Sequence, residues 1–452
     1  MTMSPVKTVI LNCTEAVYPQ DWLDRRVKEF TNALRTCPTL DIYAALDLRD
    51  ETSSKAAGMF LETAAADLIL VNMASWHITP YVISAIRKHT ATPLLVYSMG
   101  GRYDETGKLH SPAGPAGLTA LTPALRDFGF RFKVIYEEPG SDVKSAEIEA
   151  FAQVVAARKK VLNSRIGLIG YANMGLYTCA YDKTHVQKKL GVEIEDYFSY
   201  EIGKRMDEES DEKIAALCRE IRETVTFTND VDDETLGRTL RLYSVMKEKA
   251  KERDLAAISI KCVCGVTEHM GIKPCMVQSL LANKDLSVIC ECDALGLVTN
   301  VIMSAVTGQT SVFMENYEFL SKEVLVGICG FLPKDFVDGE FKFKASKLGS
   351  FFLGISCVSA AKTGPITFGR LFRKGDGYAM FLSRAEARKP MKWTELGWEE
   401  PTPDFPSLLI EPEMPISHYV DLCPGQHIIL VQGDHYEKIS QLCRLMDIEV
   451  VS

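Results

Sequence analysis

From Cys290 to Phe319 the chain reads C-E-C-D-A-L-G-L-V-T-N-V-I-M-S-A-V-T-G-Q-T-S-V-F-M-E-N-Y-E-F. The apolar run that ends before Glu291 is short enough for a buried strand, and residues 294–306 have the apolar spacing of a helix. The Thr-Gly-Gln sequence that follows is typical of a helix end and a turn. A second short apolar run occupies residues 311–314. The stretch therefore predicts a strand, a helix and another strand.

Each of the two apolar runs ends at a carboxylate, Glu291 in the first and Glu315 in the second. A strand–helix–strand unit normally joins two parallel strands by a right-handed crossover. We therefore expect both glutamates at one carboxyl edge, where open α/β sheets bind ligands. Two acidic groups held together repel unless a cation or a proton lies between them. The pair predicts a metal site whose carboxylates also move protons; alternatively, each glutamate merely ends a strand and faces water.

Composition narrows the class of protein. The chain has 452 residues, of which 46% are hydrophobic and 25% charged, as expected for a soluble protein of two or three domains. Its net charge of −9 argues against a nucleic-acid-binding surface. The sequence contains no apolar run long enough to span a membrane and no recognisable signal peptide. We therefore expect a cytoplasmic protein whose 13 cysteines are reduced.

Two close cysteine pairs, Cys262-x-Cys264 and Cys290-x-Cys292, raise the alternative of a zinc site. Zinc ribbons usually use C-x₂-C spacing on loops. Both pairs here lie in apolar, strand-like runs, which favours an interpretation as small buried hydrophobic residues.

The order of strand and helix signals predicts three domains. Residues 1–163 alternate between the two patterns and predict a doubly wound parallel sheet, and residues 164–297 predict a second α/β domain that presents Glu291. Residues 298–452 hold short strand-like runs separated by glycine and basic turns, which predict a mainly antiparallel, barrel-like β domain. Arg370 is expected on one of those turns, facing water, with contact to an anionic group as the alternative. Lys261 is expected beside the site edge, where it binds substrate or forms a surface pair.

The motifs together resemble the L-fucose isomerase and L-arabinose isomerase superfamily. Two segments are similar to that family's E-x-D and F-x-[ED] segments: E-C-D at residues 291–293, and F-M-E-N-Y at residues 313–317, which is preceded by T-G-Q-T. Their glutamates are 24 residues apart. In length the chain is most similar to the shorter fucose isomerase-like proteins. The resemblance implies that Glu291 and Glu315 are catalytic carboxylates that bind a metal ion. It also implies that His427, in P-G-Q-H, is a third metal ligand.

One position departs from the family pattern. Arabinose isomerases have a further histidine shortly after the second carboxylate, where this chain has Cys329. Fucose isomerases lack that histidine, so we still expect this chain to bind a metal ion. The departure argues against arabinose as the substrate.

Trp76 and His77, in A-S-W-H-I-T-P, follow a predicted strand and resemble a Trp- and His-containing loop of arabinose isomerases. That resemblance implies that both residues bind substrate. It also implies a homo-oligomer, a trimer or a hexamer, with the active site at a subunit interface. The alternative is an exposed loop histidine with Trp76 as packing.

Two carboxylates and one imidazole suit Mn²⁺ or another divalent cation better than a sulfur-ligated zinc. We expect an aldose–ketose isomerase that acts on a sugar through a cis-enediol, with Glu315 as base and Glu291 as acid, or the reverse. The alternatives are a non-catalytic cytoplasmic sugar-binding protein and a metal-dependent sugar epimerase or aldolase. The pattern does not distinguish a pentose, a deoxyhexose or an acidic sugar as the substrate.

Overall fold

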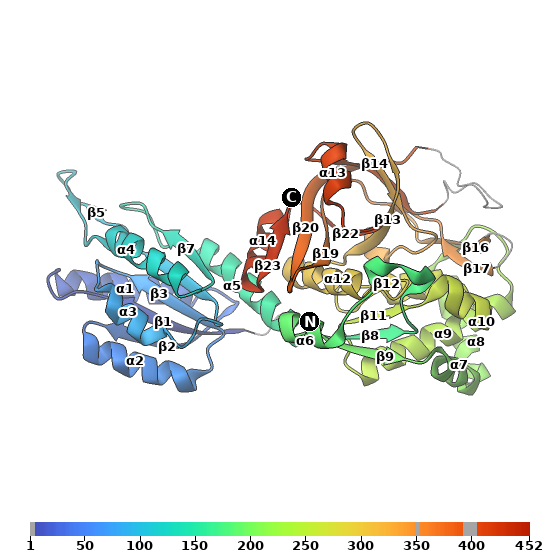
Figure 1. The fold of residues 1–452 in the computed structure, drawn as a ribbon, viewed down its shortest axis with the longest axis horizontal. Coiled ribbons are helices and arrows are strands. Elements are labelled where there is room, and N and C mark those ends of the chain that lie inside the picture. The colour runs from blue at the N-terminus through green and yellow to red at the C-terminus, as the bar shows by residue number, and fades with distance from the viewer. Residues whose placement is uncertain (1–4, 349–351, 392–404) are drawn as a thin grey trace. The chain divides into compact units, whose positions relative to one another are not determined.

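The computed structural model describes residues 5–348, 352–391 and 405–452, and the chain divides into two compact units, Met1–Lys159 and Lys160–Ser452 (Figure 1). The first unit is built on a parallel sheet with the strand order β2-β1-β3-β4-β7. Its strands are β1 (Val6–Cys13), β2 (Leu40–Leu48), β3 (Leu68–Met73), β4 (Leu94–Ser98) and β7 (Phe132–Tyr136). Its helices are α1 (Gln20–Leu34), α2 (Glu51–Ala64), α3 (Thr79–Ile86), α4 (Gly114–Asp127) and most of α5 (Ser145–Leu162). A short hairpin, β5 (Arg102–Tyr103) and β6 (Leu109–His110), extends from it.

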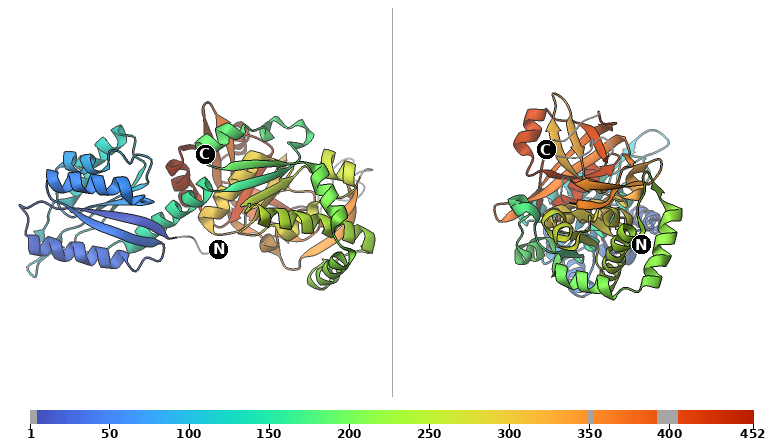
Figure 2. Two further views of the ribbon diagram at one scale, coloured as in Figure 1. Left: turned by 90° about the horizontal axis from the view of Figure 1, so that it is seen from below. Right: turned by 90° about the vertical axis from the view of Figure 1, so that its right-hand side faces the viewer.

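Helices cover both faces of this first sheet (Figure 2). One face packs against α2, α3 and α4, because alternate strand residues such as Val71 and Val96 join the apolar sides of those helices in one cluster. On the opposite face, Phe30 of α1 lies against Tyr97 of β4, with ring centroids 4.7 Å apart. The period-2 alternation of buried strand residues toward two helical layers confirms a doubly wound sheet.

The second unit begins with another parallel sheet, with the strand order β12-β11-β8-β9. Its strands are β8 (Arg165–Ile169), β9 (Glu193–Tyr197), β11 (Ala257–Ile260) and β12 (Ser287–Cys290). Its helices are α6 (Lys183–Leu190), α7 (Ser199–Glu208), α8 (Asp211–Thr224), α9 (Asp233–Glu252), α10 (Glu268–Met270), α11 (Cys275–Leu281) and α12 (Ala294–Thr307).

The rest of the second unit is a closed antiparallel barrel of six strands in the order β19-β22-β13-β14-β21-β20, in which β20 pairs again with β19. The strands are β13 (Val312–Phe319), β14 (Val324–Gly327), β19 (Gly364–Lys374), β20 (Gly377–Arg388), β21 (Ser407–Pro412) and β22 (His427–Gln432). A further strand, β23 (Ile448–Val451), pairs parallel to β20. The predicted β-rich C-terminal region is confirmed.

Smaller elements surround the barrel. Two helices lie in its connections, α13 (Ile416–Leu422) and α14 (Tyr436–Leu445). Two small sheets flank it: β10 (Thr226–Phe227) with β16 (Lys342–Leu348) and β17 (Phe352–Cys357), and β15 (Val337–Asp338) with β18 (Ala360–Ala361). Leu240 of α9 and Met276 of α11 share one hydrophobic core with the barrel residues Phe368 and Leu430. The helices and the barrel therefore bury a common apolar interior.

Helix α12 connects the second parallel sheet to the barrel (Figure 1). Its residues 294–306 are all buried, because the helix packs against β12 on one side and β19 and β22 on the other. A helix that is apolar on every side needs cover all round. The predicted stop is confirmed, since Gly308 has a φ of 68° and its N–H donates to Ser304 O at 3.0 Å.

One expectation about this stretch is wrong. Strands β12 and β13 are not parallel neighbours in a single sheet: β12 is the edge of the parallel sheet, whereas β13 is an antiparallel barrel strand. The physical reason is the all-round burial of α12. A crossover helix of a single sheet covers one face and leaves the other to solvent, but α12 is covered on its second side by the barrel.

The predicted boundary at residue 297, between the second and third domains, stays a prediction. Within the residues that the structure describes, no helix is both long enough and apolar enough to cross a membrane.

Candidate metal and catalytic site

Glu291 and Cys292 form a sharp turn directly after β12. Their φ angles are 68° and 52°, in the left-handed region that residues other than glycine seldom adopt. The Glu291 N–H donates to Ile260 O at 3.1 Å, and the Asn173 N–H donates to the Glu291 carbonyl at 3.0 Å. The Cys292 N–H donates to Ser259 Oγ at 3.0 Å. Such strain persists only where surrounding contacts enforce it, and it is concentrated at functional sites.

Glu291, Glu315 and His427 meet where the parallel sheet adjoins the barrel. One ligand atom from each lies within 4.8 Å of the others. Glu315 of β13 and His427 of β22 are direct partners in the antiparallel ladder. Glu291 Oε2 lies 3.2 Å from His427 Nε2. Glu291 and His427 are buried and Glu315 is half-buried. The structure thus brings the three predicted ligands together, although not along one sheet edge.

The other ring nitrogen of His427 is held by Asp293. His427 Nδ1 lies 2.8 Å from Asp293 Oδ2. An ionised carboxylate can only accept a hydrogen bond, so Nδ1 carries the hydrogen and Nε2 faces Glu291. Gln426 also lies against this nitrogen, with its Nε2 3.0 Å from His427 Nε2. A carboxylate behind a histidine in this way fixes the ring orientation of a metal ligand.

Asp293 is in turn paired with Arg370 of β19. Arg370 Nη1 lies 2.5 Å from Asp293 Oδ2, and Nη2 lies 3.2 Å from Oδ1. Their side chains are 1% and 0% exposed. The pair leaves no room for a side chain at position 296, where a Cβ on Gly296 would lie 2.7 Å from Asp293 Oδ2. Asp293 also caps α12 by accepting from the Gly296 N–H at 3.0 Å.

Electrostatics follow from these contacts. Burial would raise the pKa of Asp293, but the Arg370 guanidinium and His427 hold it well below its usual range. Burial would lower the pKa of His427, but Asp293, Cys179 and Glu291 together raise it well above its usual value. Without a metal ion, His427 therefore carries a proton that a cation binding at Nε2 must displace.

A divalent cation fits this cluster on two grounds. Neighbouring ligands of an octahedral ion at about 2.1 Å lie about 3.0 Å apart, close to the spacing of Glu291 Oε2 and His427 Nε2. Within the described residues, the buried Glu291 Oε2 makes no hydrogen bond. A second possible group, Cys179, Asp293 and His427, shares the histidine. Its Asp293 is already neutralised by Arg370, so we favour the first group.

The cysteine pairs do not form a metal group. In the part of the chain that the structure describes, neither possible metal group contains two cysteines. Cys262, Cys290 and Cys292 are buried, and Cys264 is exposed. Cys329, at the position of the family's further histidine, belongs to neither group and accepts at its carbonyl a hydrogen bond from Cys275 Sγ at 3.5 Å.

Trp76 and His77 belong to the first compact unit, between β3 and α3. The His77 side chain is fully buried, and its Nδ1 lies 3.0 Å from Glu15 Oε1. Trp76 is 40% exposed. The histidine is therefore not the exposed loop side chain of the alternative interpretation. The role of both residues in substrate binding stays a prediction.

Sequence reasoning missed Asp293 and misplaced Arg370. Arg370 was expected on a solvated turn, but it lies within β19 and is almost completely buried. The reason is its ion pair with Asp293, which lets a cation replace an apolar residue on an inward-facing strand position. The signal was present in the sequence as a lone arginine inside the apolar run I-T-F-G-R-L-F.

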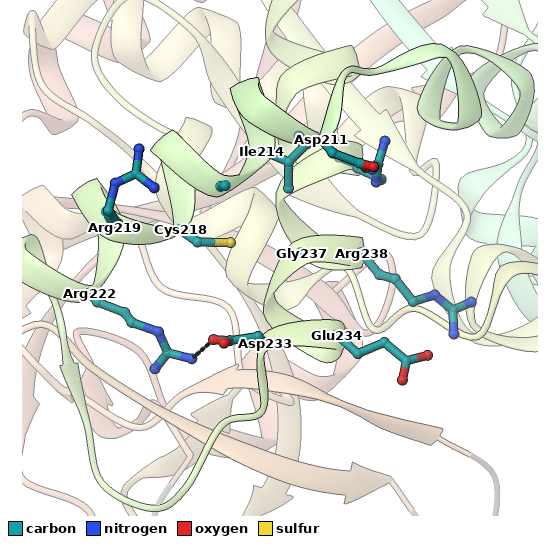
Figure 3. A pocket seen from close by; sticks show the side chains of 11 residues that line it. Asp211, Ile214, Cys218, Arg219, Arg222, Asp233, Glu234, Gly237 and Arg238 are labelled. Carbon is teal, nitrogen blue, oxygen red and sulfur yellow. Dashed lines mark hydrogen bonds and ion pairs between the residues drawn. The ribbon is translucent and has the colours of Figure 1, made fainter.

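A pocket of about 560 Å³ lies elsewhere in the second unit, along α8 and α9 (Figure 3). Charged side chains of both signs line it, and Arg222 pairs there with Asp233 at 2.7 Å. It shares no residue with the carboxylate–histidine cluster, and its Arg241 is paired with Asp211. We assign it no role in the chemistry.

The fold and the cluster together define an α/β protein with a closed barrel and a candidate metal centre at their junction. No family model matches the chain. The chain is similar to two curated proteins, each named sulfoquinovose isomerase. One, from Alkalicoccus urumqiensis, is 20% identical over 386 residues, which is 82% of either chain. The other, from Clostridium sp. (strain MSTE9), is 19% identical over 285 residues, 63% of either chain.

These relatives support the prediction of an enzyme and, at the level of class, of a sugar isomerase. Membership of the L-fucose and L-arabinose isomerase superfamily stays a prediction.

Proposed function

We propose that this protein is a divalent-metal-dependent aldose–ketose isomerase that acts on a sugar through a cis-enediol. The observation that carries the proposal is the meeting of Glu291, Glu315 and His427, in which a buried oxygen of Glu291 makes no hydrogen bond with any described residue. The names of the two relatives support an isomerase and make sulfoquinovose the first sugar to test.

The residues of the cluster and their neighbours would have the following roles in the reaction. Glu291, Glu315 and His427 would hold the cation, for which Mn²⁺ is our proposal. When bound, such a cation polarises the oxygens on C1 and C2 of the sugar. Asp293 keeps the His427 ring in place, and Arg370 keeps Asp293 ionised.

Proton transfer falls to the two glutamates. Glu315, the less buried of the two, removes the proton from C2, and Glu291 returns a proton at C1, while the hydroxyl proton of the sugar moves from O2 to O1; in the reverse assignment the two glutamates exchange roles. Both carboxylates approach the same cluster from different elements, so one sugar lying across it is within reach of both. Positioned acid–base groups of this kind supply about 10²–10⁴-fold in rate.

We test the proposal by proton exchange. The protein is loaded with Mn²⁺ in D₂O and incubated with sulfoquinovose and a panel of neutral aldoses and ketoses, and the C1 and C2 protons are followed by NMR. We expect deuterium to enter C2 of an aldose as the ketose forms, and exchange to stop when a chelator removes the metal.

A sugar that binds without exchange would instead favour the sugar-binding alternative. Exchange that yields an epimer or a cleaved product would favour the epimerase or aldolase alternative.

The proposal also covers the assembly of the protein and its location in the cell. We propose a cytoplasmic homo-oligomer, a trimer or a hexamer, in which Trp76 and His77 contribute to a site at a subunit interface. Light scattering of the purified protein measures the assembly directly, and a monomeric protein with full activity would contradict a shared site.

A further inference from the structure

Lys261 is a buried cation that has no acidic partner among the residues that the structure describes. It follows β11 and is 5% exposed. Three other buried cations have partners: Arg370 pairs with Asp293, Arg26 pairs with Glu137, and Lys273 donates a hydrogen bond to Ser356 Oγ at 2.6 Å. Lys249 pairs with Glu201. Within residues 5–348, 352–391 and 405–452, Lys261 forms no ion pair, and its three ammonium hydrogens have no acceptor. Burying an unpaired charge is costly, so its retention calls for a ligand.

The contact at its ammonium is an aromatic ring. Lys261 Nζ lies 3.3 Å from the ring centroid of Tyr171. Tyr171 is 67% exposed, so the ring covers the charge from the solvent side. A cation–π contact of this kind is weaker than a charge-assisted hydrogen bond to an anion. An anionic group that reaches the ammonium would therefore compete well with the ring.

Two glycines make the space for the lysine stem. A Cβ at Gly170 would lie 2.9 Å from Lys261 Cβ, and a Cβ at Gly265 would lie 2.9 Å from Lys261 Cγ. Gly170 also has a φ of +98°, which other residues rarely adopt. The backbone on both sides of Lys261 is thus shaped around its side chain, which is a built arrangement and not a surface charge.

Lys261 and Glu291 directly follow the neighbouring strands β11 and β12. Lys261 directly follows Ile260, whose carbonyl accepts from the Glu291 N–H at 3.1 Å. Strands β11 and β12 are neighbours, so the two side chains start about 4.8 Å apart along the sheet edge. The loop that carries Tyr171 also touches the cluster, since Asn173 N donates to the Glu291 carbonyl at 3.0 Å. A six-carbon sugar is long enough to extend from one strand end to the next.

We propose that Lys261 is the specificity-determining residue of this protein, and that its ammonium binds the anionic group of an acidic sugar whose C1 and C2 lie at Glu291, Glu315 and His427. The inference rests on the proposed isomerase function and adds the substrate class. The shared chemistry is a sulfonate, carboxylate or phosphate on the carbon farthest from the reacting end.

The first arm of the test compares sugars that differ in that group. Isomerisation of sulfoquinovose, glucuronate, glucose 6-phosphate and neutral 6-deoxyglucose is measured with the wild-type protein and with Lys261→Met, Lys261→Arg and Lys322→Met. Lys322 is an exposed lysine and controls for the change in net charge. We expect Lys261→Met to lower kcat/KM for the preferred acidic sugar about 10- to 100-fold, to leave the neutral sugar unchanged, and to be partly rescued by Lys261→Arg.

The second arm does not depend on turnover. Dissociation constants of the same four sugars are measured by calorimetry in a chelator, where the proposed function predicts no turnover, on the wild-type protein and on Lys261→Met. We expect the acidic sugar alone to bind about tenfold or more weakly without the lysine. Equal losses for acidic and neutral sugars, or no preference for any acidic sugar in the parent protein, would overturn the assignment.

The two arms separate this inference from the function on which it rests. If no sugar exchanges protons but an acidic sugar still binds in a Lys261-dependent way, the isomerase function is rejected and the anion site at Lys261 is retained. If isomerisation is the same with and without Lys261, the isomerase function is retained and the anion site at Lys261 is rejected.

Discussion

Two buried glutamates, one in each compact unit, follow parallel strands and meet different surroundings. Glu137, directly after β7, accepts from Arg26 at 2.6 Å, from Tyr97 at 2.6 Å and from the Gly100 N–H at 3.2 Å. Glu291, directly after β12, has one oxygen that makes no hydrogen bond among the described residues. A fully satisfied carboxylate holds a fold together, whereas an unsatisfied one in the same topological position is available for a cation.

The same contrast applies to the buried histidines. His77 in the first unit faces a single carboxylate, that of Glu15. His427 in the second has Asp293 at one ring nitrogen and Glu291 at the other. Burial dominates the first and lowers the pKa of His77, despite Glu15. In the second, Asp293, Cys179 and Glu291 together outweigh burial and raise the pKa of His427. The number of acidic partners therefore separates a histidine whose pKa falls on burial from a candidate metal ligand whose pKa rises.

The largest effect is expected at the carboxylates of the cluster. Glu291→Gln and Glu315→Gln each remove a proton-transfer group and a metal ligand, so we expect a loss of about 10²–10⁴-fold in the rate of deuterium exchange at C1 and C2. Glu318→Gln, an exposed position on the same strand, is the matched control and should retain the wild-type rate. A wild-type rate of deuterium exchange in either cluster variant would contradict the assignment of catalytic roles.

The next effect is on stability, in the first unit. Glu137→Gln leaves Arg26 as a buried cation with only Glu29 as an ionic partner, at 2.9 Å. We expect the free energy of unfolding to fall by about 3 kcal/mol, the low end for breaking a buried pair, because Glu29 compensates in part. Urea unfolding measures this change.

Glu29→Gln is the control, because its exposed side chain should contribute less than about 1 kcal/mol. The metal content of both variants should equal that of the wild type. A loss of metal from Glu137→Gln would show that the comparison between the two glutamates is mistaken.

A smaller effect, on metal affinity, is expected at Asp293, which contacts Nδ1 of His427. Asp293→Asn removes the carboxylate that orients His427, so we expect Mn²⁺ affinity to weaken by about 10–100-fold. Calorimetric titration with Mn²⁺ measures the affinity, and Asp338→Asn, at an exposed aspartate, is the control. Unfolding in a chelator separates the metal effect from the cost of leaving Arg370 unpaired. Unchanged affinity would mean that the His427–Asp293 contact is structural only.

The smallest effect concerns pH. The pKa of His77 is lowered in the folded protein because burial disfavours its charged form, while Glu15 acts in the opposite direction. The unfolded chain then binds more protons just below pH 6.5, so the stability associated with neutral His77 is lost as the pH falls from about 6.5 toward the folded pKa. We expect a shallower pH dependence of the urea midpoint between pH 7.5 and 5 in His77→Gln than in the wild type. Parallel profiles would contradict a buried, neutral His77.

Local pattern predicted the elements around the cluster closely. The helix expected at residues 294–306 is α12, and its stop at Gly308 is a left-handed glycine cap, because capping and apolar spacing are set by nearby residues. The two carboxylates of the candidate metal site were predicted from their place after apolar runs. Their companion Asp293 was not singled out, since its partners Arg370 and His427 are 77 and 134 residues away in the sequence.

The sequence by itself determined the class of each part: two parallel α/β sheets, a β-rich C-terminal region and a set of three candidate ligands. Those features follow from hydrophobic periodicity and short motifs, which act over a few residues. Only the tertiary structure decided that Glu291 and Glu315 meet across a junction between a sheet and a barrel, that Arg370 is buried beside the cluster, and that Lys261 has no acidic partner among the described residues. Ion pairing and burial depend on residues far apart in the chain, so no local pattern specifies them.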